Sequence, residues 1–129
     1  MTLTQTSDTL LRSAIRLDGV VVAALGIGMI ALAATGSTLT GLPAVVEYVA
    51  GALSIAYGPA AFYLAAQPRV RPAGMALGAV NVLTTVALVV LVATGIAGLT
   101  GTGNALALAV AAYTAAIGGL QLYAARVAA

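Results

Sequence analysis

Few side chains in this sequence are suited to acid–base or ligand chemistry. Histidine, cysteine and lysine are absent, all five basic residues are arginines, and the acids are Asp8, Asp18 and Glu47. Without cysteine there is no thiolate nucleophile, and without histidine there is no imidazole base or ligand. The three carboxylates are far apart in the sequence and form no metal-binding pattern. We therefore expect a protein that is not an enzyme and that uses no cofactor and no metal.

Glu47 is the first candidate for a functional role, because a carboxyl group at membrane depth is costly and often functional. It would serve in a proton- or cation-linked process. The alternative is a position at the membrane interface near a helix N-terminus, where negative charge is favoured. Tyr57, Asn81 and Tyr113 are the other deep polar residues, and with Glu47 they form a predicted transport or ligand pocket. The alternative for these three is hydrogen bonding that only joins helices.

Asp18 is assigned a different role, because it lies beside an arginine near the start of the first long apolar segment. We expect Arg16, Asp18 and Arg126 to form an ion pair at the headgroup boundary. A coupling-ion site at Asp18 is the alternative. The five arginines are scattered, so they provide no basic stripe for nucleic acid.

The elements that must position these residues are membrane-spanning helices. Of the 129 residues, 62% are hydrophobic and only 6% are charged, whereas soluble domains carry about 25% charged residues. A membrane helix needs about 20 mostly apolar residues, and four segments qualify. We expect one transmembrane domain over 1–129, an all-α, up-down-up-down four-helix bundle, with spans at about 17–35, 43–66, 73–95 and 104–125.

The segment before the first span is predicted to be a short cytoplasmic helix over about 7–16, with Ser7 as its N-cap. We expect this helix to begin in the headgroups and to continue into the membrane. The alternative is an interfacial helix that docks a cytoplasmic partner. A signal peptide that ends at an A-x-A site around Ala33 is the alternative for the first span. All five arginines lie before span one, between spans two and three, or after span four. Because positive residues stay in the cytoplasm, both termini and the middle loop are predicted to face the cytoplasm.

Small residues are abundant in the spans, and they allow membrane helices to approach closely. Gly74 and Gly78 form a G-x-x-x-G pattern, and Ala115 and Gly119 repeat the spacing. Packing within the chain and a dimer face are both open. When the sequence is compared with itself at an offset of 60 residues, the L-T-G at 39–41 aligns with the L-T-G at 99–101. This match suggests that the chain consists of two duplicated hairpins.

Several short motifs resemble those of small, uncharacterised four-span integral membrane proteins of actinobacteria. The motifs are L-R-S-A-I-R-L-D-G at Leu11–Gly19, G-L-P at Gly41–Pro43, P-R-x-R-P at Pro68–Pro72, Asn81, and L-Q-L-Y-A-A-R at Leu120–Arg126. The resemblance implies a bacterial inner-membrane location and four helices, and it transfers no functional residues.

The first functional hypothesis is a non-enzymatic accessory or structural subunit that self-associates or joins a larger membrane complex. The second is a small transporter or channel for protons, ions or small cationic compounds, which would use Glu47 and the pocket around Tyr57, Asn81 and Tyr113. Membrane lipids are expected partners in both cases. A lipid- or small-ligand-binding module is a third hypothesis.

Overall fold

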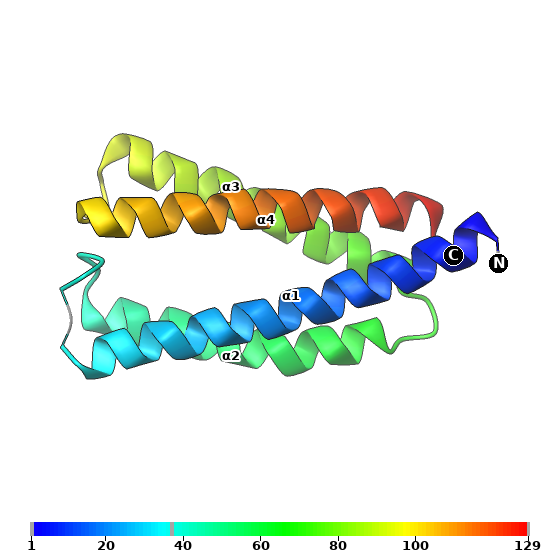
Figure 1. The fold of residues 1–129 in the computed structure, drawn as a ribbon, viewed down its shortest axis with the longest axis horizontal. Coiled ribbons are helices and arrows are strands. Elements are labelled where there is room, and N and C mark those ends of the chain that lie inside the picture. Colours follow the sequence, from blue (N-terminus) through cyan, green and yellow to red (C-terminus); the bar gives the residue numbers. More distant parts are fainter. Residues whose placement is uncertain (1, 37, 129) are drawn as a thin grey trace.

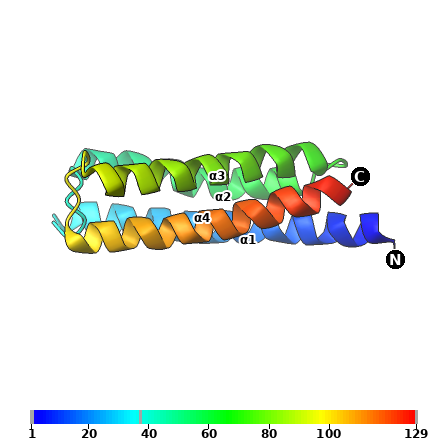
Figure 2. The same cartoon turned by 90° about the horizontal axis from the view of Figure 1, so that it is seen from above.

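The computed structural model describes residues 2–36 and 38–128, so Ser37 of the predicted first turn lies outside the described residues. Four antiparallel helices make up this part of the chain: α1 (Leu3–Ala34), α2 (Ala44–Ala65), α3 (Arg71–Thr94) and α4 (Gly101–Val127). The two chain ends and the α2–α3 loop lie at one end of the bundle (Figure 1 and Figure 2). We call this the terminal end, and the opposite end, with the α1–α2 and α3–α4 loops, the loop end.

All four helices are long and apolar enough to cross a membrane. Large aliphatic side chains such as Ile27, Leu53 and Leu83 point outward and are more than half exposed. The buried residues, in contrast, include five polar or charged ones: Asp18, Glu47, Asn81, Thr114 and Gln121. Because an apolar exterior around a partly polar interior suits lipid rather than water, the fold is that of a small multi-pass membrane protein.

Helix α1 is one continuous helix, which confirms that residues 7–16 continue into the first span. The helix begins earlier than predicted, so Ser7 lies inside it and is not its N-cap. Its N-cap is Thr2, whose hydroxyl accepts a hydrogen bond from the Gln5 amide at 3.2 Å. The Gln5 side chain in turn accepts from the Thr2 amide at 2.9 Å, which completes a capping box. With no glycine or proline before Gly19 to interrupt it, the helix reaches 32 residues, or about 48 Å.

The helices form two tight hairpins, α1–α2 and α3–α4, which contact each other mainly through α1 and α4. Glycines make the close approach within each hairpin feasible. A Cβ atom on Gly26 would lie 2.5 Å from the carbonyl oxygen of Gly51, and one on Gly118 would lie 3.1 Å from that of Gly78. Larger side chains at these positions would therefore push the paired helices apart.

Both glycines of the G-x-x-x-G pattern face the interior of this chain. A Cβ atom on Gly74 would lie 2.6 Å from a methyl carbon of Leu11 in α1, and one on Gly78 would lie 2.7 Å from Leu122 in α4. The pattern therefore packs helices within the chain. Around Gly74, at the terminal end, lies the hydrophobic core, which consists of Leu11, Ile15, Ala61, Ala65, Val70, Ala124, Ala125 and Ala128.

The hairpins also meet at the loop end. The Thr100 amide donates to the Thr40 carbonyl oxygen at 3.0 Å, and the Thr100 hydroxyl donates to the carbonyl oxygen of Leu39. We call these two contacts the loop junction. The 60-residue offset aligns Thr40 with Thr100, so the residues that meet are those that a duplication would make equivalent. The duplication itself stays a prediction.

Candidate functional site: a buried polar network around Asp18

Asp18 lies near the middle of α1 and is fully buried. Three of the side chains that reach it also come from the middle parts of their helices, at Tyr57 in α2, Asn81 in α3 and Tyr113 in α4. Asp18 is therefore at the centre of the bundle and well inside its length. From the sequence, Asp18 was expected at the end of a helix, because the first apolar segment begins at about residue 17. The structure does not place it there.

Four side chains from the other three helices donate hydrogen bonds to the Asp18 carboxylate. The Tyr57 hydroxyl donates to Oδ2 at 2.5 Å, and the Tyr113 hydroxyl donates to Oδ1 at 2.7 Å. The Asn81 amide donates to Oδ2 at 3.1 Å, and the Gln121 amide donates to the same oxygen at 3.3 Å. Asn81 also donates to Gln121 Oε1 at 2.9 Å. We call these five residues the Asp18 network.

No basic side chain takes part in this network within residues 2–36 and 38–128. The expected ion pair of Asp18 with Arg16 and Arg126 is not formed in this part of the chain, and both arginines are exposed. Two residues along a helix correspond to a rotation of about 200°, so Arg16 points away from the interior that Asp18 enters. Asp18 is held by neutral donors alone.

Glu47 lies elsewhere, at the loop end of α2, where only 1% of its surface is exposed. It precedes Tyr57 by ten residues, or about 15 Å along the helix. Its Oε1 accepts a hydrogen bond from the Thr40 hydroxyl at 3.3 Å. The structure thus brings Tyr57, Asn81 and Tyr113 together, but around Asp18 rather than around Glu47.

The position of Asp18 at the centre of the polar network was not predicted from the sequence, where an ion pair was preferred to a coupling-ion site. Gln121 was expected to converge with Asn81, and it does so at 2.9 Å. A usable signal for the position of Asp18 was present, because Leu11, Ile15 and Asp18 follow the i, i+4, i+7 spacing of one helix face. All three are completely buried. Extending α1 back beyond Leu17 would have placed Asp18 on the inward face.

A second polar contact joins α3 and α4 on the loop side of the network. The hydroxyl oxygens of Thr85 and Thr114 lie 2.7 Å apart, and the Thr85 hydroxyl is also 3.2 Å from the Ala111 carbonyl oxygen. These groups are neutral and form an interhelical hydrogen bond of the kind common in membranes. The helices are therefore joined by uncharged hydroxyl groups at Thr85 and Thr114, and by a carboxylate in the neighbouring Asp18 network.

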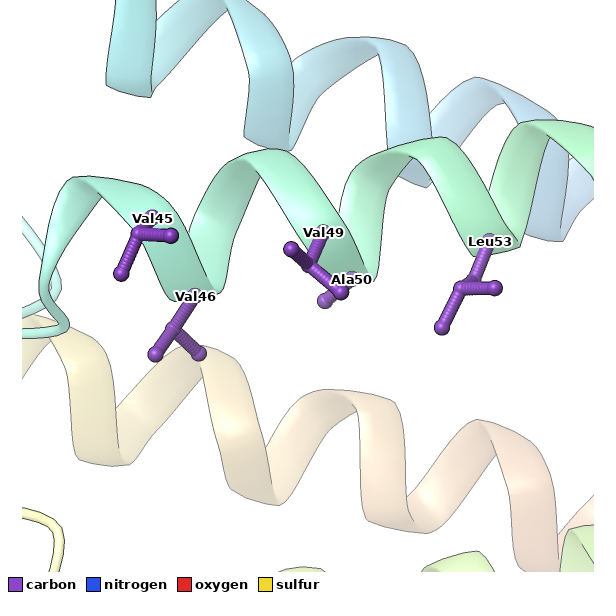
Figure 3. A pocket seen from close by; sticks show the side chains of 5 residues that line it. All are labelled: Val45, Val46, Val49, Ala50 and Leu53. Carbon is purple, nitrogen blue, oxygen red and sulfur yellow. The ribbon is translucent and has the colours of Figure 1, made fainter.

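An open groove of about 320 Å³ runs along the loop half of α2, and Figure 3 shows the aliphatic side chains that line it. Its lining residues are Val45, Val46, Val49, Ala50 and Leu53. None of them is polar, so the groove suits a lipid acyl chain better than a polar substrate. Neither Glu47 nor any residue of the Asp18 network lines it.

The described residues contain no group of three or more carboxylate, histidine or cysteine side chains that could hold a metal ion. The Asp18 network is thus the most developed chemical feature of the described chain. Comparison with protein-family models, with curated proteins and with solved structures gives no match.

Proposed function

We propose that the protein is a small proton-linked membrane transporter or channel in which Asp18 binds and releases the proton. The observation that supports this proposal is a fully buried carboxylate that receives hydrogen bonds from three neighbouring helices and has no cationic partner among the described residues. An ionisable group in such a position is a functional candidate by default, because it is expensive to insert.

A purely structural role accounts less well for a carboxylate at this position. Helix-centre Asp costs about 2.5–3.5 kcal/mol on insertion scales, whereas an interhelical hydrogen bond contributes about 0.6 kcal/mol on average. Neutral hydroxyls perform the joining task at Thr85 and Thr114. The carboxyl group at Asp18 therefore supports a role that needs an ionisable group.

Protonation of Asp18 would change the network in a defined way. Oδ2 accepts hydrogen bonds from Tyr57, Asn81 and Gln121. A proton on Oδ2 turns this oxygen from an acceptor into a donor, so at least one of these side chains must turn away. Asn81 and Gln121 can keep the hydrogen bond to each other. Proton binding would thus loosen the contact of α1 with the other helices and open the network to proton exchange.

The test is proton flux in proteoliposomes under an imposed pH gradient, compared between the native protein, Asp18→Asn and protein-free vesicles. We expect flux in the native protein and background flux in Asp18→Asn. Equal flux in both proteins, or no native flux above background, would overturn the proposal. Flux of sodium or potassium without proton movement would also overturn the proton assignment. Gel filtration and helicity measurements must show that the Asn variant is folded.

Glu47→Gln belongs in the same experiment, because sequence analysis made Glu47 the first candidate for a transport role. The Asp18 network does not include Glu47, so we expect this variant to retain proton flux. Loss of flux in Glu47→Gln with normal flux in Asp18→Asn would return the transport role to Glu47.

A second proposal is an accessory subunit that self-associates or joins a larger membrane complex. It is supported by the outward position of Ala115 and Gly119 on α4, both of which are exposed. A Cβ atom on Gly119 would meet nothing within 4 Å, so this face has room for a second helix. Cross-linking in mild detergent tests the proposal, and a strictly monomeric species without co-purifying partners would contradict it.

We further propose that the terminal end faces the cytoplasm of a bacterial cell, with the protein in the plasma membrane. All five arginines lie at that end or in the half of α1 that leads to it, which is the distribution that the positive-inside rule describes. The resemblance to actinobacterial four-span proteins supports the same location.

A further inference from the structure

We propose that Glu47 is a second proton-binding site, located at the loop end, and that its protonation controls the loop junction between the two hairpins. Glu47 is 1% exposed. Its Oε1 accepts from the Thr40 hydroxyl at 3.3 Å, and its Oε2 has no hydrogen-bond partner among the described residues. The proposal goes beyond the transport role of Asp18 and does not depend on it.

No charged side chain in residues 2–36 and 38–128 forms an ion pair with Glu47. Between Asp18 and Arg69 the sequence contains no other acid and no base, and between Arg71 and Arg126 it contains none. The end of α1, the start of α4 and both loops at this end therefore present no ionised side chain. The titratable neighbour is Tyr48 on α2 itself, which is 43% exposed.

A buried oxygen without a donor is costly for a neutral group and more costly for a charged one. A ligand that removes the charge is therefore favoured. The apolar groove on α2 is lined by Val45, Val46, Val49, Ala50 and Leu53, and Glu47 does not open into it. A proton needs no cavity, so it is the cation that fits this buried position.

Thr40 connects the carboxyl group to the loop junction. Its hydroxyl donates to Glu47 Oε1 and accepts from the Leu42 amide at 3.1 Å. Its carbonyl oxygen accepts from the Thr100 amide at 3.0 Å. A Cβ atom on Gly103 would lie 2.1 Å from the same carbonyl oxygen, so α4 packs directly against this residue. A change in the Thr40–Glu47 hydrogen bond should therefore alter the position of Thr40 and its contacts with α4.

Proton binding changes that bond. The carboxylate form accepts the Thr40 hydroxyl hydrogen. When the proton resides on Oε1, the acid O–H becomes the donor, and the Thr40 hydroxyl must turn its own hydrogen away. When the proton resides on Oε2, Oε1 becomes a neutral and weaker acceptor. In both cases the restraint on Thr40 weakens, and the Thr40–Thr100 hydrogen bond loses support.

Glu47 is the one glutamate in the sequence, which permits a selective measurement. Cell-free synthesis with glutamate ¹³C-labelled at the side-chain carboxyl carbon marks Glu47 alone. The carbon signal, read by infrared or NMR spectroscopy in detergent, distinguishes acid from carboxylate. We expect it to switch reversibly with pH while the protein stays folded. A signal that stays in one form across that whole range would overturn the proposal.

Hydrogen exchange of the Thr100 amide gives the second readout. Relative to Glu47→Gln, the native protein should show an additional change in exchange at the pH at which the label switches. Thr40→Val should keep the carbon transition but lose that change, whereas the matched control Thr84→Val should keep both. Native exchange that equals that of Glu47→Gln at every pH would overturn the control of the junction. Asp18→Asn should retain both transitions, which separates this result from a failure of the transport proposal.

Discussion

Tyr57 and Tyr113 donate to different oxygens of Asp18, and the two oxygens are not equally well supplied. Oδ2 also receives the amides of Asn81 and Gln121. Oδ1 receives Tyr113 as its one donor among the described residues. An acceptor that loses its last partner bears the full cost of desolvation, so the two tyrosine hydroxyls should differ in their contribution to stability.

We predict that Tyr113→Phe lowers the free energy of unfolding by about 1–3 kcal/mol, because it leaves a buried carboxylate oxygen unpaired. Tyr57→Phe should cost less, about 0.6–1.5 kcal/mol, because Oδ2 keeps two donors. Unfolding by a denaturing detergent measures both values. Tyr123→Phe is the control, since Tyr123 is 65% exposed. The reverse ranking of Tyr57 and Tyr113 would contradict the geometry of the network.

At this scale the sequence predicted part of the site. Tyr57, Asn81 and Tyr113 were grouped because polar residues at membrane depth are costly. Asp18 was given the wrong partners, since its proximity to Arg16 in sequence suggested an ion pair. The i, i+4, i+7 spacing of Leu11, Ile15 and Asp18 indicates that they share a face, and the packing of Leu11 and Ile15 in the core shows that this face points inward.

At the scale of the helix, α1 stabilises the end of α2 through Arg12. The guanidinium group donates to the carbonyl oxygens of Ala65, Gln67 and Pro68 at 2.6, 2.7 and 3.2 Å. These oxygens lie at and just beyond the C-terminus of α2, where positive charge is favourable and carbonyls lack helical partners. Arg12, which the sequence associated with membrane orientation and with Asp8 one turn earlier, is thus also a helix cap.

We predict that Arg12→Met lowers the free energy of unfolding by about 1.5–3 kcal/mol, because charged hydrogen bonds to these carbonyls are lost while the aliphatic stem is kept. Arg16→Met is the matched control. Arg16 is exposed, and we expect a change of less than about 0.5 kcal/mol. Unfolding in a denaturing detergent measures the free energy of unfolding of both variants. Equal losses in the two variants would refute the capping role of Arg12.

The α1–α2 contact offers another matched pair, because two glycines two residues apart face opposite surroundings. A Cβ atom on Gly26 would lie 2.5 Å from the Gly51 carbonyl oxygen and 2.8 Å from the Ser54 Cβ, whereas one on Gly28 would meet nothing within 4 Å. Gly26→Ala should destabilise the protein by about 1–3 kcal/mol through overpacking. Gly28→Ala should be neutral or stabilising, because alanine favours the helix. Thermal melts in detergent test this difference.

The four helices themselves could be predicted from sequence, because about 20 apolar residues in a row have few alternatives to a span. The predicted span 43–66 differs from α2 by a residue at each end. The start of α1 was harder to predict, since residues 3–16 are too polar to register as part of a span.

At the scale of the whole molecule, the two hairpins touch at three levels: the hydrophobic core at the terminal end, the Asp18 network at mid-length, and the loop junction. Asp18, a buried carboxyl group, lies within one of these levels, and the buried Glu47 contacts another, the loop junction, through Thr40. If both proposals hold, protonation acts on the contact between the hairpins at two separate depths.

Membrane orientation is also a property of the whole molecule, and the absence of cysteine makes it simple to measure. We predict that a single cysteine at Gln67, in the α2–α3 loop, reacts with a membrane-impermeant maleimide only after the cells are opened. A cysteine at Ile96, in the α3–α4 loop and 80% exposed, should react in intact cells. The opposite labelling pattern would place the terminal end outside.

The length of α1 has a practical consequence. At about 48 Å it exceeds the roughly 30 Å thickness of a bilayer's hydrocarbon layer, so we expect its first turns to extend past the lipid tails as a rigid helix. The hydrogen bond from Arg12 to the Ala65 carbonyl oxygen holds this part of α1 against α2. A globular protein spliced in helical register onto this helix would be carried at a fixed angle to the bundle. It would serve as a fiducial for electron cryomicroscopy of a chain that is otherwise too small to align.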